Sequence, residues 1–174
     1  MSNKNLITQE ESTKQTLRKA TDIINRTNKI LKNSKKELVA NPDVMIIDGK
    51  MWQKETVEEE MYWDKAMEYA KNLRLGGYDD WRLPTIEELK DVVRSCGGIP
   101  IRREDNMGRR PQTDKFYENL EKLNFSVSMF DHYLSSTIGI AVDTDSHLIM
   151  DFYSAYCCDY AFYVSGQVRC LREI

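Results

Sequence analysis

The run of residues from Gly76 to Leu89 constrains the fold of this chain more than any other stretch, and it reads Gly-Gly-Tyr-Asp-Asp-Trp-Arg-Leu-Pro-Thr-Ile-Glu-Glu-Leu. Gly76 and Gly77 can adopt positive φ, so they end the preceding helix and turn the chain. Thr85 and Glu88 have the spacing of a capping box, in which each side chain accepts a hydrogen bond from the backbone amide of the other residue. The run therefore predicts one helix before Gly76 and a second that begins at Thr85.

The rest of this region predicts a domain that mixes helices with short strands. Asp48-Gly49 indicates a tight turn inside a strand region. Apolar residues at helical spacing predict two main helices, with Ile86, Leu89, Val92 and Val93 as the buried face of the second. The final strand is expected to return to the first. The expected elements are a strand and turn over 44–52, helices over 62–75, 85–95 and 114–123, and strands over 133–140, 146–153 and 160–171.

The N-terminal region predicts one amphipathic helix over 8–39. Leu17, Ile24, Leu31 and Leu38 recur every seven residues and form an apolar stripe. The stripe leaves three interpretations open: packing on the chain's own domain, self-association into a homo-oligomer, or presentation to a partner. Residues 1–45 carry nine Lys or Arg against five Asp or Glu, whereas the remainder carries sixteen against twenty-three. We therefore expect an N-terminal helix and linker over 1–43 and a separate domain over 44–174.

Further motifs accompany the central run. They are Met51-Trp52-Gln53, Tyr133-Leu134-Ser135-Ser136-Thr137 and Val168-Arg169-Cys170-Leu171-Arg172. Together, in order from about Val44 to Arg172, they resemble the Lcl C-terminal domain family, which implies an α+β, C-type-lectin-like fold. Arg82-Leu83-Pro84-Thr85 is also similar to a motif of the formylglycine-generating enzyme superfamily. In the family pattern a Trp usually stands where this chain has Leu134. The structural motif residues that the resemblance implies are Trp52, Asp80, Trp81, Arg82, Pro84, Thr85, Glu88, Ser135, Ser136 and Arg169.

The cysteines and the N-terminus indicate the cellular compartment in which the chain is expected. The resemblance implies a bridge partner for Cys170 in the helix before the glycine pair, but Ala70 stands there. We therefore expect Cys96, Cys157, Cys158 and Cys170 to be unbridged. The first residues contain no apolar signal core, and no stretch is long enough to span a bilayer, so the chain as written is expected in the cytoplasm. The family is often exported, which would require that a signal had been removed.

The segment between Pro100 and Pro111 is the expected binding loop, because loops on a rigid scaffold often carry binding residues. It holds two arginine pairs, Arg102-Arg103 and Arg109-Arg110. Arginine fits carboxylates and phosphates through paired hydrogen bonds, although exposed arginines are more often simply solvated.

Other kinds of site are poorly supported. Asp143, Asp145 and Asp151 lack the glycine and the terminal Glu of a calcium loop. Two histidines are too few for a histidine-based metal cluster, and neither a nucleophile with its base nor a phosphate-binding glycine loop is recognisable. No aromatic residues interleave with the basic ones, so nucleic-acid binding is not expected. We expect neither metal nor cofactor.

The sequence favours a non-catalytic binding module that recognises a protein partner through loops of the C-type-lectin-like scaffold. Such a module suits an effector or inhibitor from a mobile element. Two alternatives remain: a cysteine oxidoreductase related to the formylglycine-generating enzymes, and an adhesin domain that binds polyanionic glycans.

Overall fold

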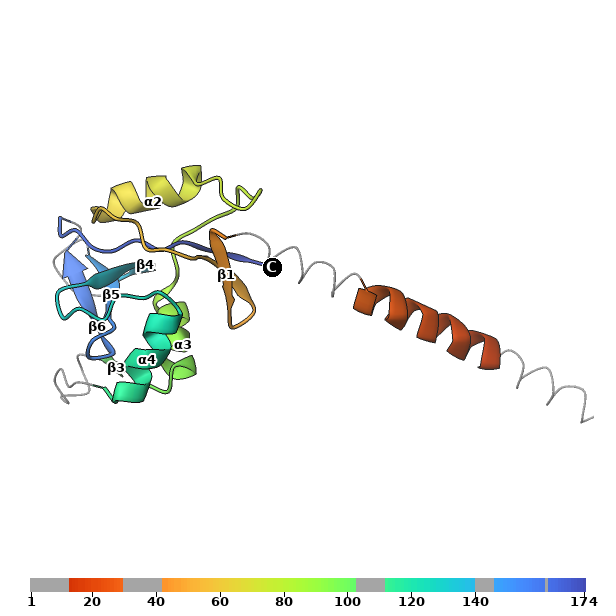
Figure 1. The fold of residues 1–174 in the computed structure, drawn as a ribbon. Coiled ribbons are helices and arrows are strands. Elements are labelled where there is room, and N and C mark those ends of the chain that lie inside the picture. The colour runs from red at the N-terminus through yellow and green to blue at the C-terminus, as the bar shows by residue number, and fades with distance from the viewer. Residues whose placement is uncertain (1–12, 30–41, 103–111, 140–145, 162) are drawn as a thin grey trace, which may run out of the picture. The chain divides into compact units, whose positions relative to one another are not determined.

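The computed structural model describes residues 13–29, 42–102, 112–139, 146–161 and 163–174. The chain divides into two compact units, Met1–Asn41 and Pro42–Ile174, drawn in Figure 1. Residues 13–29 of the first unit form a helix, as predicted; the other residues of the predicted helix lie outside the described part. No described helix is both long enough and apolar enough to cross a bilayer.

The second unit begins with a β-hairpin. Strand β1 (Val44–Ile47) pairs antiparallel with β2 (Lys50–Gln53), and Ile47 lies opposite Lys50. Asp48 and Gly49 form the two-residue turn, with φ of 49° and 77°. Positive φ at both positions is the geometry of the turn type that suits hairpin twist, and it explains why a Gly follows the Asp. The predicted tight turn is confirmed.

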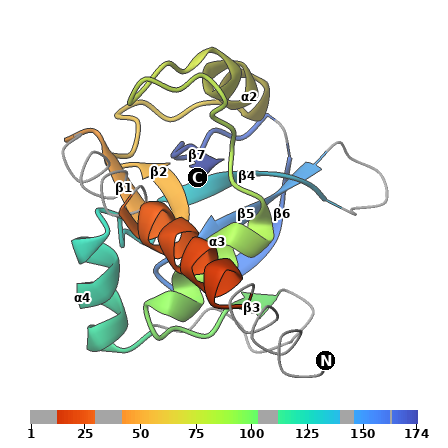
Figure 2. The ribbon, with the colours of Figure 1, turned by 90° about the vertical axis from the view of Figure 1, so that its right-hand side faces the viewer.

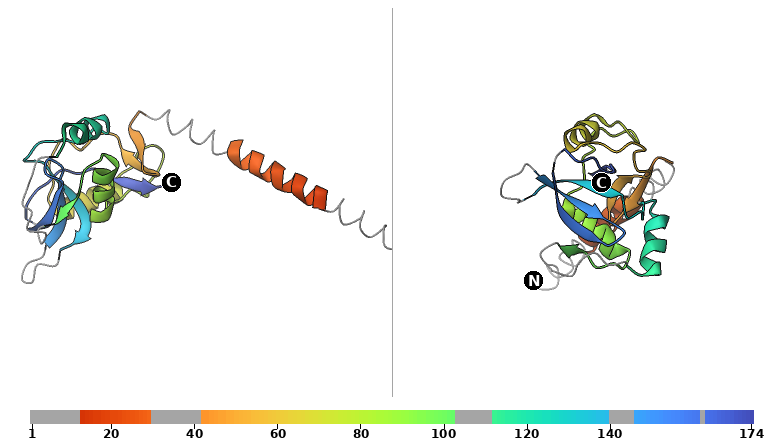
Figure 3. Two further views of the ribbon diagram at one scale, coloured as in Figure 1. Left: turned by 90° about the horizontal axis from the view of Figure 1, so that it is seen from below. Right: turned by 90° about the vertical axis from the view of Figure 1, so that its left-hand side faces the viewer.

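The end of the chain completes this first sheet. Strand β7 (Leu171–Glu173) pairs antiparallel with β2, so the strand order is β1-β2-β7. The last strand therefore returns to the first strand region, 44–52, as predicted, and pairs with its second arm, β2, not with β1. Figure 3 shows β7 and the C-terminus beside the hairpin at which the unit begins.

Two main helices follow the hairpin. Helix α2 (Trp63–Asn72) ends three residues before the predicted end. Gly76 and Gly77, with φ of 64° and 84°, do not cap it; they form the centre of a turn closed by reciprocal backbone hydrogen bonds between Leu75 and Tyr78. Helix α3 (Ile86–Ser95) begins with the predicted capping box of Thr85 and Glu88.

A four-stranded sheet forms the other half of the unit. Its order is β3-β6-β5-β4, with β3 parallel to β6 and the other pairs antiparallel. The predicted single strand over 160–171 is wrong. Its first residues belong to β6 and Leu171 begins β7. Between them, Tyr163 is exposed, whereas Val168 and Cys170 are buried in a segment with isolated bridges at Gly166 and Gln167. The strands are β3 (Ile101–Arg102), β4 (His132–Ile138), β5 (Ser146–Asp151) and β6 (Tyr156–Ala161).

The core lies between α3, the sheets and helix α4 (Asp114–Lys122). Helix α3 packs against β4 and β5 (Figure 2). It buries Ile86, Leu89, Val92 and Val93, as predicted. An aromatic cluster fills the space beside it, with Phe125 at its centre. Its ring centroid lies 5.8 Å from that of Trp52, 4.8 Å from that of Phe152 and 5.3 Å from that of Tyr133.

Candidate functional site

The motif residues around Thr85 form one hydrogen-bonded cluster. The guanidinium of Arg82 donates to both carboxylate oxygens of Glu88, at 2.7 Å each. The same carboxylate accepts from the backbone amide of Thr85 at 2.7 Å. Burial raises the pKa of Glu88, but the hydrogen bonds from Arg82 and Thr85 outweigh it and lower the pKa to about 2. Glu88 is therefore a fixed anion that positions the start of α3, and it is poorly suited to proton transfer near neutral pH.

This cluster extends to the first sheet. Arg82 also donates to Glu173 at 2.6 Å, and Lys50 lies 3.6 Å from Glu173 and 3.8 Å from Glu88. The four charges join β2, β7 and the start of α3. Arg172, the residue of β7 before Glu173, binds both carboxylate oxygens of Asp80, and its guanidinium lies over the ring of Tyr78. These contacts give Asp80 and Arg82 structural roles.

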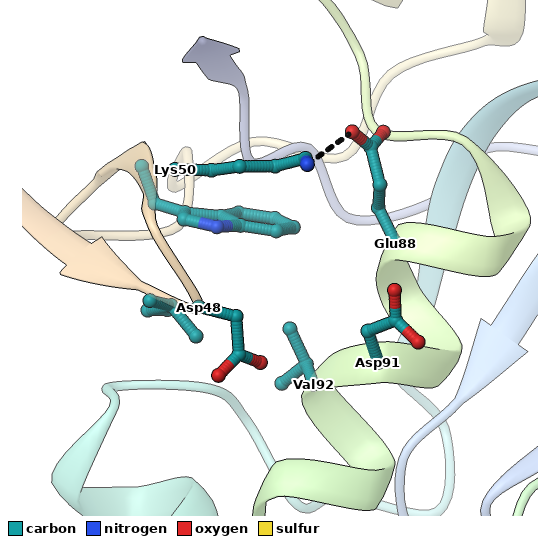
Figure 4. A pocket seen from close by; sticks show the side chains of 7 residues that line it. Asp48, Lys50, Glu88, Asp91 and Val92 are labelled. Carbon is teal, nitrogen blue, oxygen red and sulfur yellow. Dashed lines mark ion pairs between the residues drawn. The ribbon is translucent and has the colours of Figure 1, made fainter. Parts of the chain in front are cut away.

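The cluster borders a small hollow between the hairpin turn and α3 (Figure 4). The carboxylates of Asp48 and Asp91 stand at its sides and Lys50 lies across it. Its volume is about 40 Å³. Pockets for small ligands measure about 300–1,000 Å³, so this hollow suits a few water molecules or one small ionic group. It is lined by Ile47, Asp48, Lys50, Trp52, Glu88, Asp91 and Val92.

The Ser-Ser-Thr motif joins α3 to β4. The backbone amide of Ser136 donates to the carbonyl of Pro84 at 2.8 Å, and the hydroxyl of Thr137 accepts from the amide of Ile86 at 2.9 Å. Thr137 thus satisfies a second free amide at the start of α3. The carbonyl of Ser135 accepts from the indole of Trp63 on α2 at 2.8 Å. Both main helices are tied to one strand in this way.

Arg169 is a buried cation held mainly by backbone oxygens. Its guanidinium donates to the carbonyls of Gln53 at 2.7 Å, Lys54 at 2.7 Å and Leu123 at 2.6 Å, and it lies over the ring of Phe125. Burial lowers its pKa to about 10, so it stays charged at neutral pH. The side chain is 1% exposed, which makes it an internal tie between segments.

The predicted arginine loop is only partly described. Ile101 and Arg102 belong to β3, which corrects the prediction that they lie in a loop; the reason is their parallel pairing with Tyr156 and Cys157. The side chain of Arg102 is exposed, and its Nη2 lies 3.5 Å from Oε1 of Glu87 on α3. Arg103, Arg109 and Arg110 lie outside the described residues.

All four cysteines are buried, and no disulfide joins them in the described part of the chain. Burial raises the pKa of the Cys96 thiol, and that of Cys170 to about 12. Cys157 and Cys158 lie on β6 in the sheet. A reactive thiol needs the opposite environment, with access and a lowered pKa.

Metal ligands do not gather in the described residues, where no group of three His, Cys, Asp or Glu is placed to hold an ion. Asp143 and Asp145 lie outside them. Asp151 accepts hydrogen bonds from the amide of Tyr153 and the hydroxyl of Ser154 at the end of β5. His147 is buried against Trp63, and burial lowers its pKa to about 4.

One surface feature escaped the sequence analysis. Four large apolar side chains, Tyr62, Met129, Phe130 and Tyr163, are 54%, 50%, 77% and 81% exposed. They come from three segments that hydrogen bonds hold together. Met61 and Gly166 exchange two backbone bonds of 3.0 and 2.9 Å, and the amide of Gln167 donates to the carbonyl of His132 at 2.8 Å.

We call these four side chains the loop face. The only sequence signal for it is the apolar pair Met129-Phe130 inside the turn that Asp131 closes on Ser128. Turns are formed mostly by Gly, Pro, Asn, Asp and Ser, so an apolar pair in a turn is unusual.

Comparison with known proteins identifies the family. The curated proteins contain no match to this sequence. Among solved structures, the crystal structure of botrocetin is similar, with a TM-score of 0.46 and 9% sequence identity over 76% of this chain and 98% of that chain. The family model described as the Lcl C-terminal domain matches residues 47–172. With its two small sheets and main helices, the unit has the predicted α+β class. The chain belongs to the Lcl C-terminal domain family.

Proposed function

We propose that the second unit is a non-catalytic binding module that recognises a protein partner through the loop face. The exposure of Tyr62, Met129, Phe130 and Tyr163 on neighbouring segments carries the proposal. Single exposed apolar residues are ordinary, but several on adjoining segments are typical of interaction surfaces. Aromatic residues and Met are also enriched at the centres of protein interfaces.

The surroundings of the loop face suggest the chemistry of the partner. Glu58, Glu59 and Glu60 are exposed on the segment that leads to Tyr62, and Glu60 accepts a hydrogen bond from Ser165. A carboxylate rim beside an apolar centre favours a partner whose apolar patch is bordered by Lys and Arg. Binding of such a partner should weaken as salt is raised. A module of this kind can act as an effector or inhibitor by covering a surface of its target.

The contacts of the motif residues support a non-catalytic role. The hydrogen bonds of Arg82, Glu88 and Arg169 hold elements of the fold together. The oxidoreductase alternative needs an accessible thiolate, whereas Cys170 is fully buried with a pKa of about 12. The polyanion-binding alternative rests on the arginine pairs, of which Arg102 already contacts Glu87.

The first experiment compares three forms of the chain as bait in extracts of the source cell, with quantitative mass spectrometry. The test variant carries Phe130→Ser and Tyr163→Ser. The control carries Ile99→Ser, which removes a 69% exposed apolar side chain between α3 and β3. We expect one protein to be retained by the wild type and the control, and at least about tenfold less by the test variant, since central aromatic residues dominate binding energy. Calorimetric titration of that purified protein should give the same order of affinities, with the wild type and the control alike and the test variant weaker. Equal retention by all three forms would refute the proposal that the loop face is the recognition surface.

A fourth form separates the loop face from the arginine segment. It reverses Arg102, Arg103, Arg109 and Arg110 to Glu. If this form alone loses the partner, the recognition surface is the arginine segment and the loop face is wrong. If the wild type instead binds heparin and this form does not, while no protein is retained, the glycan-binding alternative replaces the proposal.

A further inference from the structure

The helix over residues 13–29 has an apolar stripe that the proposed function does not use. Leu17, Ala20, Ile24 and Thr27 follow one another at steps of three and four residues, with Ile23 beside them. Leu17, Ile23 and Ile24 are 68%, 63% and 58% exposed on this helix. In the sequence the same spacing continues to Leu31 and Leu38. Apolar residues that alternate at three and four steps form the seam of a coiled coil.

From this stripe we propose that the helix pairs with the same helix of a second copy of the chain. A repeat of seven residues presents the same surface at every second turn, so the stripe can match itself along its length. Large side chains at Leu17 and Ile24 alternate with the small ones of Ala20 and Thr27, which allows the two helices to interdigitate.

Thr27 is compatible with burial in this seam. Its hydroxyl donates to the carbonyl of Ile23, four residues earlier, at 3.0 Å. The hydrogen-bond donor of the side chain is thus satisfied by the helix itself, and burial leaves no donor without an acceptor. The methyl group remains available for packing.

The composition of the stripe favours a second copy over a membrane surface. The described helix carries Lys14, Arg18, Lys19, Arg26 and Lys29 against Asp22. At about 100° per residue, Arg18 and Lys29 fall opposite the stripe, so pairing keeps them in solvent and apart. Helices that lie on membranes usually place Trp, Phe or Leu in their apolar face. This stripe shares Leu17 with them, but it has no aromatic residue and includes Ala20 and Thr27.

Pairing would couple two binding units in one particle. Two linked sites can exceed the affinity of either by roughly 10²–10⁴ when the target offers two copies of its surface. The inference itself is measured without any partner, so its failure leaves the proposed function intact.

The test is the mass of the full chain in solution, by sedimentation velocity and light scattering. The wild type should show about twice the 20.4 kDa of one chain. Leu17→Asp with Ile24→Asp should give single chains, because charges in the seam oppose pairing. The matched control, Gln15→Asp with Asn25→Asp, makes the same charge change on the far face of the helix and should pair like the wild type.

Three results would overturn the inference. One is a wild type that has the mass of one chain up to about millimolar concentration, the weak end of specific affinity. Another is a Leu17 and Ile24 variant that still pairs. The third is a wild type that remains single and sediments with vesicles of phosphatidylglycerol, which would assign the stripe to an anionic membrane. Unchanged circular dichroism and thermal melting of the second unit confirm that the variants are folded.

Discussion

Arg82 binds both carboxylate oxygens of Glu88, with Nη1 2.7 Å from Oε2 and Nη2 2.7 Å from Oε1. The two residues are close in sequence, but Arg82 pairs with Leu171 in β7 through two backbone hydrogen bonds, whereas Glu88 is in the first turn of α3. One ion pair therefore fixes the helix against the end of the chain. Paired hydrogen bonds between Arg and a carboxylate are both stronger and more directional than a single one.

The first prediction concerns acid stability. The pKa of Glu88 is lowered from 4.5 to about 2 in the folded chain. Its stabilisation is therefore present above pH 4.5 and is lost as the pH falls toward 2. Because the network is partly open to solvent, we expect a loss on the order of 1–2 kcal/mol. Glu88→Gln should remove that part of the acid dependence, measured by urea unfolding between pH 6 and about 2.5.

Glu68→Gln is the control for this measurement, since Glu68 forms an exposed pair with Lys65 at 3.1 Å. Its change should stay below about 0.5 kcal/mol. An acid profile of Glu88→Gln that follows the wild type would contradict the role of the pair.

The second prediction concerns Trp81. It is 3% exposed and its indole donates to the carbonyl of Leu75 at 3.1 Å. Trp81→Ala should lower the free energy of unfolding by about 3–5 kcal/mol, as large core truncations do. Trp81→Phe should recover much of this loss, because it restores volume without the hydrogen bond. Tyr163→Ala, at an 81% exposed position, should unfold at the wild-type urea concentration. A Trp81→Ala chain as stable as the wild type would refute the assignment.

The third prediction compares the contributions of two arginines, Arg169 and Arg172, to stability. Arg169→Lys should destabilise by about 3 kcal/mol or more, because an ammonium does not reproduce the planar set of bonds and remains buried. Arg172→Lys removes an exposed bidentate pair with Asp80 and should cost about 1 kcal/mol or less. Thermal melting of both variants tests the order. Equal melting temperatures would show that Arg169 is not an internal tie.

The fourth prediction concerns the thiols. Ellman's reagent should react slowly with the native chain, since Cys96, Cys157, Cys158 and Cys170 are buried. The raised pKa of Cys170 leaves almost no thiolate at pH 8. After denaturation without reductant, four thiols should titrate. A smaller number would reveal a bridge, and one fast thiol in the native chain would revive the oxidoreductase alternative.

What the sequence could predict was set by how local the interactions are. The capping box of Thr85 and Glu88 and the turn at Asp48-Gly49 involve neighbours in the chain, so residue type alone indicates them. The path of residues 163–170 depends on pairing with distant segments, and the apolar pattern of the sequence does not distinguish such a path from one strand.

The candidate site was harder to predict for the same reason. Exposure of Phe130 and Tyr163 is a property of the assembled fold, since most aromatic residues of this chain are at least partly buried. The role of Arg169 was equally hidden, because its oxygen acceptors lie 46 to 116 residues away. A resemblance could mark it as a motif residue without saying what it binds.

The way in which Arg169 is held has a consequence for how this domain can change. Its oxygen acceptors are main-chain carbonyls, and every residue type supplies one. Lys54 and Leu123 could therefore be exchanged for other residues without loss of those bonds. Because Arg169 binds main-chain carbonyls, the side chains of the residues that it contacts are free to diverge. A lineage could therefore acquire new targets while this one arginine keeps the fold intact.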